Sequence, residues 1–577
     1  MEDMKQDLPE PLSYTFHPSS REYQRHILPH YLDRGVKVHP EREAAVIYKS
    51  DGERTRLTFK QYQSQSIKLA AGLLRSGLTH GDRVLLVAPN SLEFIVIQMA
   101  CARIGVFLLL LKFGASSEEV LQELTYYKCQ AIMVQSCESR PGYAQGVVKA
   151  LQQKDQGQGV ESVLAVCVSF GGGQNTISYD AVMGPNPNHI SAEEKDAVAT
   201  AQSRVQMEDL LLGMMTSGST GRPKAVTMTH FQFIQATFTA AEITRLEDGS
   251  RLLNERPFTW AGGVGFGINF MAVTGITLVS MDPEISVKKA DTDLVKKILQ
   301  DERCTHLLAM PYMMYDFISS KDFHSYDLSH LKYAITGGQP ILQESAVSFV
   351  EKNPSLTLVQ VFGSAEFILT FRQMTNSSNV KRPDFGFLTI CSGVEAKVVD
   401  DNDRLVPKGT VGELCVRGPS VFSGYLDNPE ATARALTPLR WYKTGDMMVM
   451  NDQGQVRFVG RKSDIIKRAT VKVQPAEVEE VLVRHPKIVQ AYVVGVPDAR
   501  FYEELCACVQ FHDDANPVEE QLQELETWCG ESFLPGPDGL TLAPRYFLAF
   551  QNFPRTGNGK INRRELRAMA VKRLELS

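Results

Sequence analysis

The residues best suited to chemistry form one run rich in hydroxyl groups and glycine, from Thr216 to Lys224. It reads Thr-Ser-Gly-Ser-Thr-Gly-Arg-Pro-Lys and directly follows the apolar stretch Leu210–Met215. Hydroxyls and backbone N–H groups can surround phosphate oxygens, glycine permits close approach, and the lysine adds a positive charge. The order is not that of a Walker A loop. The run predicts a different polyphosphate-binding loop, with a plain solvated loop as the alternative.

Four further charged residues follow apolar or glycine-rich stretches. Glu366 ends the sequence Phe-Gly-Ser-Ala-Glu, and Asp446 ends Tyr-Lys-Thr-Gly-Asp, which predicts a tight turn before the aspartate. Arg461 stands in Gly-Arg-Lys-Ser-Asp, and Lys560 ends the glycine-punctuated Pro-Arg-Thr-Gly-Asn-Gly-Lys. Taken alone, each is more often a surface or turn residue. Their common order along the chain is what favours a functional interpretation.

In this order the five segments resemble the motifs of the ANL adenylate-forming superfamily. That superfamily includes acyl-CoA synthetases, firefly luciferase and the adenylation domains of non-ribosomal synthesis, and the resemblance covers about residues 30 to 565. It implies ATP, Mg²⁺ and coenzyme A as cofactors and a small carboxylic acid as substrate. It also implies a C-terminal domain that rotates between two half-reactions over one site.

The resemblance implies a role for each matching residue. The loop from Thr216 to Lys224 would hold the ATP phosphates, Glu366 the Mg²⁺, Asp446 the ribose hydroxyls, and Arg461 the ribose or phosphate. Lys560 would bridge the carboxylate and the α-phosphate. The implied catalytic residues are Lys560, Glu366 and Lys224, and the implied nucleotide-binding residues are Thr216, Ser217, Gly218, Ser219, Thr220, Gly221, Lys224, Gly338, Gln339, Asp446, Arg461 and Lys560.

The substrate pocket and the hinge are implied in the same way. Gly337, Gly338 and Gln339 match the segment that lines the adenine and acyl sites, and Trp260, Gly337 and Phe362 would line the substrate pocket. A plain core position is an equally good interpretation of Trp260. Ser463 takes the hinge position, where φ and ψ must change. The sequence does not identify the carboxylic acid that is activated. Medium-chain fatty acids and aryl acids are both candidate substrates.

The chemistry agrees with these implied roles. A carboxylate and ATP are both anions, so positioning and cationic stabilisation supply most of the catalysis of adenylation. A carboxylate is already a nucleophile, and no general base is needed before it attacks the α-phosphorus. Pyrophosphate leaves, and the thiol of coenzyme A then attacks the acyl-adenylate.

Two departures from the family pattern bear on these steps. Ala365 replaces a threonine whose hydroxyl would touch the AMP phosphate, a charge-assisted bond worth about 1.5–3 kcal/mol; Ser364 is a candidate substitute. Thr470 replaces a glycine in the loop that would line the pantetheine tunnel, where a β-branched residue narrows the passage and disfavours positive φ. The alternatives to a CoA ligase are therefore another acceptor, a luciferase-like oxidation, or a nucleotide-binding pseudoenzyme. The intact charged residues argue against the last.

The elements that must position these residues alternate between helix and strand in the first half of the chain. Apolar spacing predicts helices over Phe59–Leu78 and Glu118–Tyr127 and buried strands over Val84–Val87 and Ala131–Val134. The apolar segment Phe94–Leu111 predicts a helix, a glycine stop and a strand rather than a membrane span. The stretch from Gly171 to about Gln206 predicts a long surface connection. Further strands are predicted at Thr305–Met310, Tyr333–Thr336 and Leu356–Phe362, whose carboxyl ends would collect the ligand.

The last third of the chain changes character. Val394–Val459 predicts a small β-rich subdomain. After it, Pro475 opens a helix, Ala491–Val496 and Leu505–Phe511 predict strands, and Asn516-Pro517 opens another helix. The predicted fold is α/β, with a large N-terminal domain of doubly wound sheets at 1–460. A mobile C-terminal α+β domain is predicted at 461–577.

Bulk composition sets outer bounds on function. The 577 residues include 43% apolar and 22% charged residues, which is typical of an ordinary globular protein. The net charge of −6 does not favour binding to nucleic acid, which is itself negatively charged. The ten cysteines lack metal-site spacing, so free thiols are expected. No signal, transit or S-K-L peroxisomal sequence is visible, which predicts a cytoplasmic protein without a transmembrane segment. The oligomeric state is left open.

Overall fold

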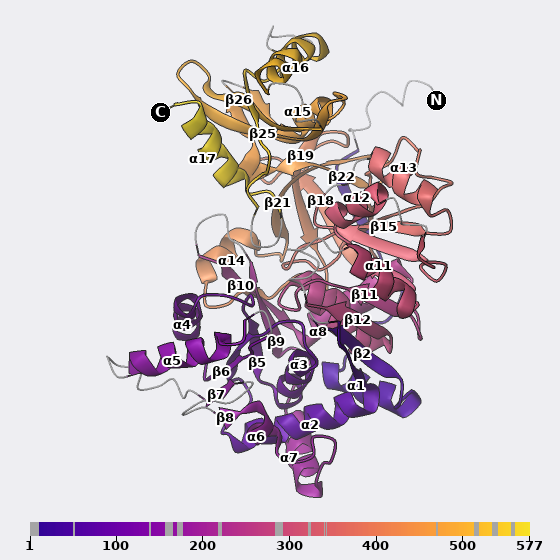
Figure 1. Ribbon diagram of the computed structural model, residues 1–577, viewed down its shortest axis with the longest axis vertical. Helices are drawn as coiled ribbons and strands as arrows, with labels where there is room; N and C mark the ends of the chain where they lie inside the picture. Colours follow the sequence, from indigo (N-terminus) through magenta and orange to yellow (C-terminus); the bar gives the residue numbers. More distant parts are fainter. Residues whose placement is uncertain are drawn as a thin grey trace, which may run out of the picture. The chain divides into compact units, whose positions relative to one another are not determined.

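The computed structural model describes most of the chain as two compact units (Figure 1). The larger unit comprises Phe16–Glu395 and Val416–Tyr442, and the smaller unit comprises Met1–Thr15, Ala396–Cys415 and Lys443–Ser577. The described residues are 11–49, 52–137, 140–155, 166–169, 177–216, 222–282, 292–320, 325–339, 341, 343–468, 471–512, 518–533, 541–555 and 560–576. The predicted α/β class is confirmed. The predicted boundary between the N-terminal and C-terminal domains, at 460/461, falls inside the smaller unit. That the chain rotates at this boundary stays a prediction.

One sheet of the larger unit carries both ends of the predicted phosphate loop. Its order is β20-β10-β9-β5-β4-β6-β7-β8, with β9 through β8 parallel and β10 antiparallel to both of its neighbours. The strands are β4 (Arg83–Val87), β5 (Phe107–Leu110), β6 (Ala131–Val134), β7 (Val166–Ser169), β8 (Ile177–Ser178), β9 (Leu210–Thr216), β10 (Lys224–Thr229) and β20 (Gly424–Tyr425).

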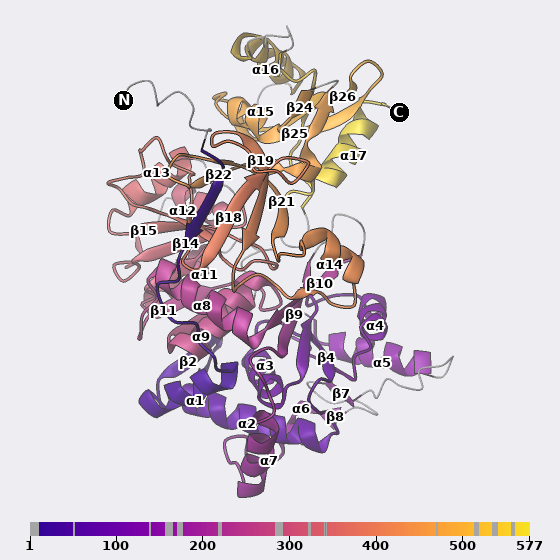
Figure 2. The same ribbon diagram turned by 180° about the vertical axis from the view of Figure 1, so that it is seen from behind.

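Helices cover this sheet. Helices α4 (Ser117–Tyr126) and α5 (Tyr143–Asp155) lie together beside it in both views, and they share an apolar core with β4, β5 and β6 (Figures 1 and 2). Helix α3 (Leu92–Ile104) is buried from Phe94 onward, contacts β5, and ends at Gly105, whose φ of +70° is the left-handed conformation that favours glycine. The predicted helix, glycine stop and strand are confirmed. No helix in the described part of the chain is long and apolar enough to cross a membrane.

The second sheet of the larger unit has nine strands in the order β17-β16-β15-β14-β13-β11-β12-β2-β3. The strands from β15 to β2 are parallel, and antiparallel strands close both edges. They are β2 (Glu43–Tyr48), β3 (Arg54–Thr58), β11 (Arg251–Asn254), β12 (Thr277–Met281), β13 (His306–Leu308), β14 (Tyr333–Gly337), β15 (Thr357–Phe362), β16 (Phe371–Thr375) and β17 (Thr389–Ile390).

The nine-stranded sheet has a helical layer of its own. Helices α11 (Thr292–Asp301), α12 (Pro311–Ser319) and α13 (Gln343–Lys352) pack on one face through a single apolar core (Figure 2). Helix α8 (His230–Thr244) contacts β10 of the first sheet, and α9 (Asn269–Thr274) contacts β12 and β2 of the second. The remaining helices of this unit are α1 (Leu28–Val38), α2 (Phe59–Arg75), α6 (Tyr179–Met183), α7 (Ala192–Gln202), the π-helix η2 (Ala261–Ile268) and α14 (Pro429–Ala435).

The predicted surface connection from Gly171 to Gln206 is wrong over its described part. It contains α6 and α7, which bury Val182, Met183 and Val198. Helix α7 begins with a reciprocal capping box between Ser191 and Glu194, a Ser-x-x-Glu spacing that is visible in the sequence. The many small and polar residues obscured this signal.

The smaller unit holds two sheets. The first has the order β1-β18-β19-β21-β22, and the second has β24-β23-β26-β25 with β27 parallel to β26. In the second sheet α15 and α16 pack on one face and α17 on the other, because alternate residues of β25 and β26 point to opposite sides. The elements are β1 (Tyr14–His17), β18 (Val394–Val399), β19 (Val411–Arg417), β21 (Tyr442–Met450), β22 (Val456–Arg461), the 3₁₀ turn η4 (Lys462–Asp464), β23 (Ile466–Arg468), β24 (Val471–Val473), α15 (Pro475–Leu482), β25 (Ile488–Asp498), β26 (Tyr502–Phe511), α16 (Val518–Ser532), β27 (Tyr546–Ala549) and α17 (Arg563–Arg573).

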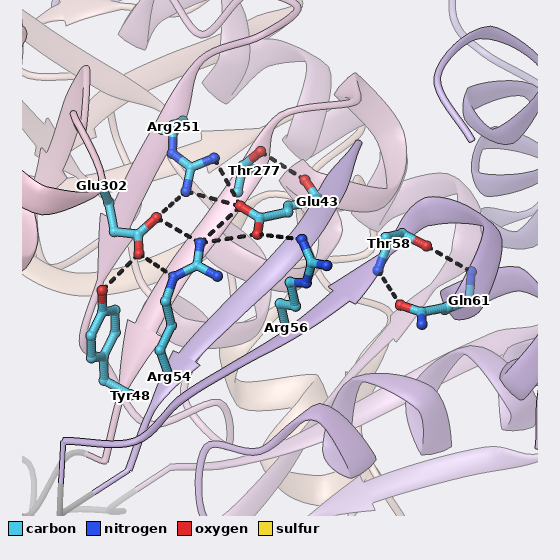
Figure 3. Close-up of polar contacts among 9 residues, drawn as sticks. All are labelled: Glu43, Tyr48, Arg54, Arg56, Thr58, Gln61, Arg251, Thr277 and Glu302. Atoms are coloured by element: carbon cyan, nitrogen blue, oxygen red, sulfur yellow. Dashed lines mark hydrogen bonds and ion pairs between the residues drawn. The ribbon is translucent and has the colours of Figure 1, made fainter. Parts of the chain in front are cut away.

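An ion-pair network joins the strands at one end of the nine-stranded sheet (Figure 3). The side chain of Glu302, 5% exposed, contacts Arg251 and lies 2.6 Å from Arg54 Nε, and it accepts a hydrogen bond from Tyr48 at 2.7 Å. Glu43 contacts the same two arginines at 3.0 and 3.3 Å. Arg251 begins β11 and Glu43 begins β2, whereas Tyr48 ends β2 and pairs with Arg54 of β3, so the network runs along the length of this edge of the sheet. Its role is structural.

We expect Glu302→Gln to lower the free energy of unfolding by about 3 kcal/mol, because it removes the most buried charge of the network and leaves two partly buried guanidinium groups with Glu43 as their remaining partner. Burial raises the pKa of Glu302, but the contacts with Arg54, Tyr48 and Arg251 together lower it by more. The pKa of Glu302 therefore lies below the usual 4.5. The stabilisation is therefore complete above about pH 4.5 and is lost as the pH falls through the lowered native value. Urea unfolding at several pH values measures the loss. Glu53→Gln, which breaks the exposed pair with Lys49, is the matched control and should cost under about 0.5 kcal/mol.

Candidate nucleotide-binding site

The predicted phosphate loop is fixed at both ends by strand pairing. Thr216 ends β9 and Lys224 begins β10, and the two residues are direct partners in the antiparallel pair. Thr216 Oγ1 also donates a hydrogen bond to the Lys224 carbonyl at 3.2 Å. The predicted phosphate contacts between them (Ser217, Gly218, Ser219, Thr220 and Gly221) lie outside the described residues.

Arg222 anchors the returning end of this loop to α4. Its guanidinium lies 3.1 Å from the carboxylate of Glu123 and 3.7 Å from the ring centroid of Tyr126, and it donates to the Gln122 carbonyl. The arginine is therefore directed to the helix rather than to a ligand. Lys224, two residues later, is the positive charge at this end of the loop.

Lys224 and Glu366, predicted from distant parts of the sequence, are linked by Tyr425. The Lys224 ammonium lies 5.0 Å from the centroid of the Tyr425 ring, within the range of a cation–π interaction. The Tyr425 hydroxyl lies 3.1 Å from Glu366 Oε1. Residue 425 lies beside β10 because β20 pairs with β10, with Tyr425 opposite Val226.

The Glu366 carboxylate is held on its other oxygen as well. Ser364 Oγ donates to Glu366 Oε2 at 2.7 Å and accepts from the Glu366 backbone N–H at 3.2 Å. Burial and the Glu366 charge raise the pKa of Tyr425, so its phenol stays protonated and donates to the carboxylate. The hydroxyl of Ser364 is thus directed to Glu366.

Two predicted pocket residues end neighbouring parallel strands. Gly337 ends β14 and Phe362 ends β15. A Cβ on Gly337 would lie 2.6 Å from the Val361 carbonyl oxygen, so the close approach of the strands requires glycine there. Gly338 follows with a φ of +81°, and Gln339 is half-buried. The Phe362 ring packs on Phe367 and Phe371, with centroids 5.5 and 6.1 Å apart.

Trp260 stands at the start of an unusual helix. It is half-buried, and its carbonyl accepts hydrogen bonds from the backbone of Gly263 and Val264 as the π-helix η2 begins. π-Helical turns are rare in proteins as a whole, but those that occur are often found at functional sites. The role of Trp260 in the acyl pocket stays a prediction.

Asp446 and Arg461, both in the smaller unit, are brought together. They are partners in the β21–β22 pair, and Arg461 Nε lies 2.9 Å from Asp446 Oδ1. The Asp446 side chain is 2% exposed. The predicted tight turn before Asp446 is wrong, because β21 runs through it from Tyr442 to Met450. The backbone is instead kinked at Gly445, with a φ of +71°.

The remaining predicted residues lie in the smaller unit. Ser463 is the middle residue of η4. Lys560 is half-buried and precedes Ile561, which forms an antiparallel bridge with Arg555. Thr470 lies outside the described residues. Lys560 belongs to a different unit from Lys224 and Glu366, and the joint action of these residues stays a prediction.

Sequence reasoning missed Tyr425. A tyrosine after a glycine carries no chemical signal of its own. The position of its ring and hydroxyl depends on the pairing of β20 with β10 and on a contact with a residue 59 positions away. Only the three-dimensional structure supplies both.

The sequence matches two protein-family models. Residues 32–426 match the AMP-binding enzymes, and residues 477–560 match the AMP-binding enzyme C-terminal domain. The chain is 30% identical over 94% of its length to the medium-chain acyl-CoA ligase ACSF2, mitochondrial, of Pongo abelii, of which it covers 88%. It is 29% identical over 98% of its length to the protein of the same name from Danio rerio, of which it covers 91%.

A solved structure agrees with the fold. The anthranilate CoA ligase AuaEII in complex with anthranoyl-AMP superposes with a TM-score of 0.79 at 20% identity, over 96% of this chain and 98% of that one. At this identity the likeness shows a shared fold.

Proposed function

The chain belongs to the family of AMP-binding enzymes, and from this premise we infer that it is an AMP-forming acyl-CoA synthetase. In the first half-reaction it joins a carboxylic acid to the AMP part of ATP and releases pyrophosphate. In the second it transfers the acyl group from the adenylate to the thiol of coenzyme A and releases AMP. The observation that carries the proposal is the linked group Lys224, Tyr425 and Glu366 beside the predicted phosphate loop.

The acid is a medium-chain fatty acid. The name of the Pongo abelii relative supports this choice over an aryl acid.

In the first half-reaction the charged residues of this chain position ATP. Lys224 presents its charge at the end of the phosphate loop, and Asp446 accepts hydrogen bonds from the ribose hydroxyls beside Arg461. Lys560 neutralises the carboxylate and the α-phosphate as they meet, which lowers the barrier to attack on phosphorus. These are roles for positioning and charge, and no proton transfer to a protein base is required.

The residues at Glu366 suit Mg²⁺. Among the described residues no three His, Cys, Asp or Glu side chains converge on one point. Mg²⁺ at nucleotide sites needs only one or two carboxylates, with phosphate oxygens and water completing its shell. Glu366 would hold the ion, and Ser364 and Tyr425 orient the carboxylate for it. When bound, the ion supplies positive charge to the phosphate oxygens.

The test is pyrophosphate exchange with a panel of acids, followed by AMP release with and without coenzyme A. We expect exchange with acids of medium chain length and AMP release that depends on coenzyme A. AMP release that is independent of coenzyme A would replace this function with adenylation for another acceptor. Failure to exchange with any acid would favour a nucleotide-binding pseudoenzyme.

Replacing Tyr425 by phenylalanine tests the orientation of Glu366. The ring stays beneath Lys224, but the carboxylate loses the donor to Oε1. We expect the Mg²⁺ concentration for half-maximal pyrophosphate exchange to rise about tenfold, as for other partners of metal ligands. Tyr143→Phe, which removes a 2.7 Å hydrogen bond to the Ala115 carbonyl on another part of the unit, is the control. An unchanged Mg²⁺ dependence in Tyr425→Phe would contradict this role.

The compartment stays a proposal. The cytoplasm is predicted from the sequence, whereas the Pongo abelii relative is named mitochondrial. Fractionation of cells that express the full chain with a C-terminal tag decides between the two.

A further inference from the structure

A buried carboxylate in the smaller unit, Glu413 of β19, has no part in the roles above. Its side chain is 7% exposed. Glu413 Oε1 accepts a hydrogen bond from the Gly445 backbone N–H at 3.2 Å, and Oε2 lies 2.8 Å from Lys462 Nζ. One carboxylate thus contacts the residue directly before Asp446 and the residue directly after Arg461.

The kink in β21 is attached to β19 at two consecutive residues. Besides the contact to Glu413, Thr444 Oγ1 donates to the Leu414 carbonyl at 2.9 Å and accepts from the Asp446 N–H at 3.0 Å. Gly445 has positive φ, so the strand bends directly before Asp446. The direction of the Asp446 side chain therefore depends on these contacts as well as on strand pairing.

Lys462 is held firmly as a cation. It lies 3.2 Å from Asp401 as well as near Glu413. Burial lowers the pKa of Lys462, but these two carboxylates raise it more, so the group stays charged. On the other side of Ser463, Asp464 lies 3.5 Å from Arg563 at the start of α17. Ser463 therefore stands between two residues that are each held by an ion pair.

We propose that Glu413 is a positioning residue that ties the ribose-binding Asp446 to the residue before the hinge. This rests on the proposed function for the binding of ribose by Asp446, and on the prediction that Ser463 is the hinge. Lys462 fixes the Glu413 carboxylate so that it can hold the Gly445 N–H. Losing either charge loosens the kink and moves Asp446 away from the ribose hydroxyls. The same pair holds the chain up to Lys462, which confines rotation to Ser463.

The test compares the binding of ATP and 2′,3′-dideoxyATP by calorimetry, without acid or coenzyme A. The dissociation constant of 2′,3′-dideoxyATP divided by that of ATP reports the contact to the ribose hydroxyls. A general loss of protein stability does not change this ratio. In Glu413→Ala we expect the ratio to fall to a value close to one. In Glu413→Gln and in Lys462→Met we expect it to fall about threefold from the wild-type value. The double variant Glu413→Gln/Lys462→Met should fall no further than either single variant, because both remove the same pair.

Two controls complete the design. Lys462→Arg restores the charge and should return the ratio to the wild-type value. Lys408→Met removes a half-buried lysine that donates to the Asp452 carbonyl in the same unit, and it should leave the ratio unchanged. Melting temperatures confirm folding, and Glu413→Gln and Lys462→Met decide the question if Glu413→Ala does not fold. An unchanged ratio in these folded variants overturns the inference while leaving the proposed function intact. A wild-type ratio of one overturns the ribose role of Asp446 first.

Discussion

Lys560→Ala is expected to lower pyrophosphate exchange by about 100-fold to 1,000-fold, the size of effect seen when one electrostatic contact to a transition state is removed. The carboxylate and the α-phosphate repel each other, and this lysine is the cation assigned to both. In the second half-reaction the adenylate already exists, so CoA-dependent turnover of a supplied acyl-adenylate should persist. The measurement is a pair of single-turnover rates, one for each half-reaction.

The control for this variant is Lys572→Ala, which removes an exposed lysine of α17 in the same unit. It should leave both rates unchanged. Wild-type exchange in Lys560→Ala would remove this residue from the mechanism. An equal loss in both half-reactions would point to a folding defect in place of a role in adenylation.

Glu366→Gln should be nearly as damaging, with exchange reduced about 100-fold at saturating Mg²⁺. Glutamine keeps the shape of the side chain but loses the charge, and its amide group would face one of the two donors, Ser364 or Tyr425. ATP binding measured by calorimetry in EDTA should change little, because the variant alters the proposed Mg²⁺ ligand rather than a proposed nucleotide contact.

Glu395→Gln is the matched control, since Glu395 pairs with Arg417 at 2.7 Å in the same unit. It should exchange at the wild-type rate. If Glu366→Gln retained full exchange with an unaltered Mg²⁺ requirement, another residue would have to hold the ion.

Sequence reasoning placed the regular elements well where apolar periodicity was strong. The strand Ala131–Val134 has the predicted bounds, and the helix predicted to open at Pro475 does so. The resemblance to adenylate-forming enzymes is also confirmed by the family match. Local patterns determine such elements, because burial of a strand or of one helix face leaves its period in the sequence.

Sequence reasoning failed where the signal was nonlocal or masked by polar residues. Helices α6 and α7 lie in a polar stretch whose composition predicts a connection, and the residues before Asp446 predict a turn where the structure has a kinked strand. The sequence does not point to Tyr425 or Glu413, because each contacts its partner through strand pairing rather than through chain proximity. The resemblance points to the charged residues proposed to contact ligands, but not to the residues that hold those side chains in place.

The order of strands in the smaller unit has a topological consequence. The sheet β1-β18-β19-β21-β22 draws its strands from both sides of the segment Val416–Tyr442, so the chain passes repeatedly between this sheet and the larger unit. The sheet β24-β23-β26-β25 with β27 is instead built entirely from strands that follow Arg461. Among the described strands, the backbone enters that sheet once and never returns. A single connection at η4 therefore joins this sheet to the strands before it, and a rotation there would unthread no other strand.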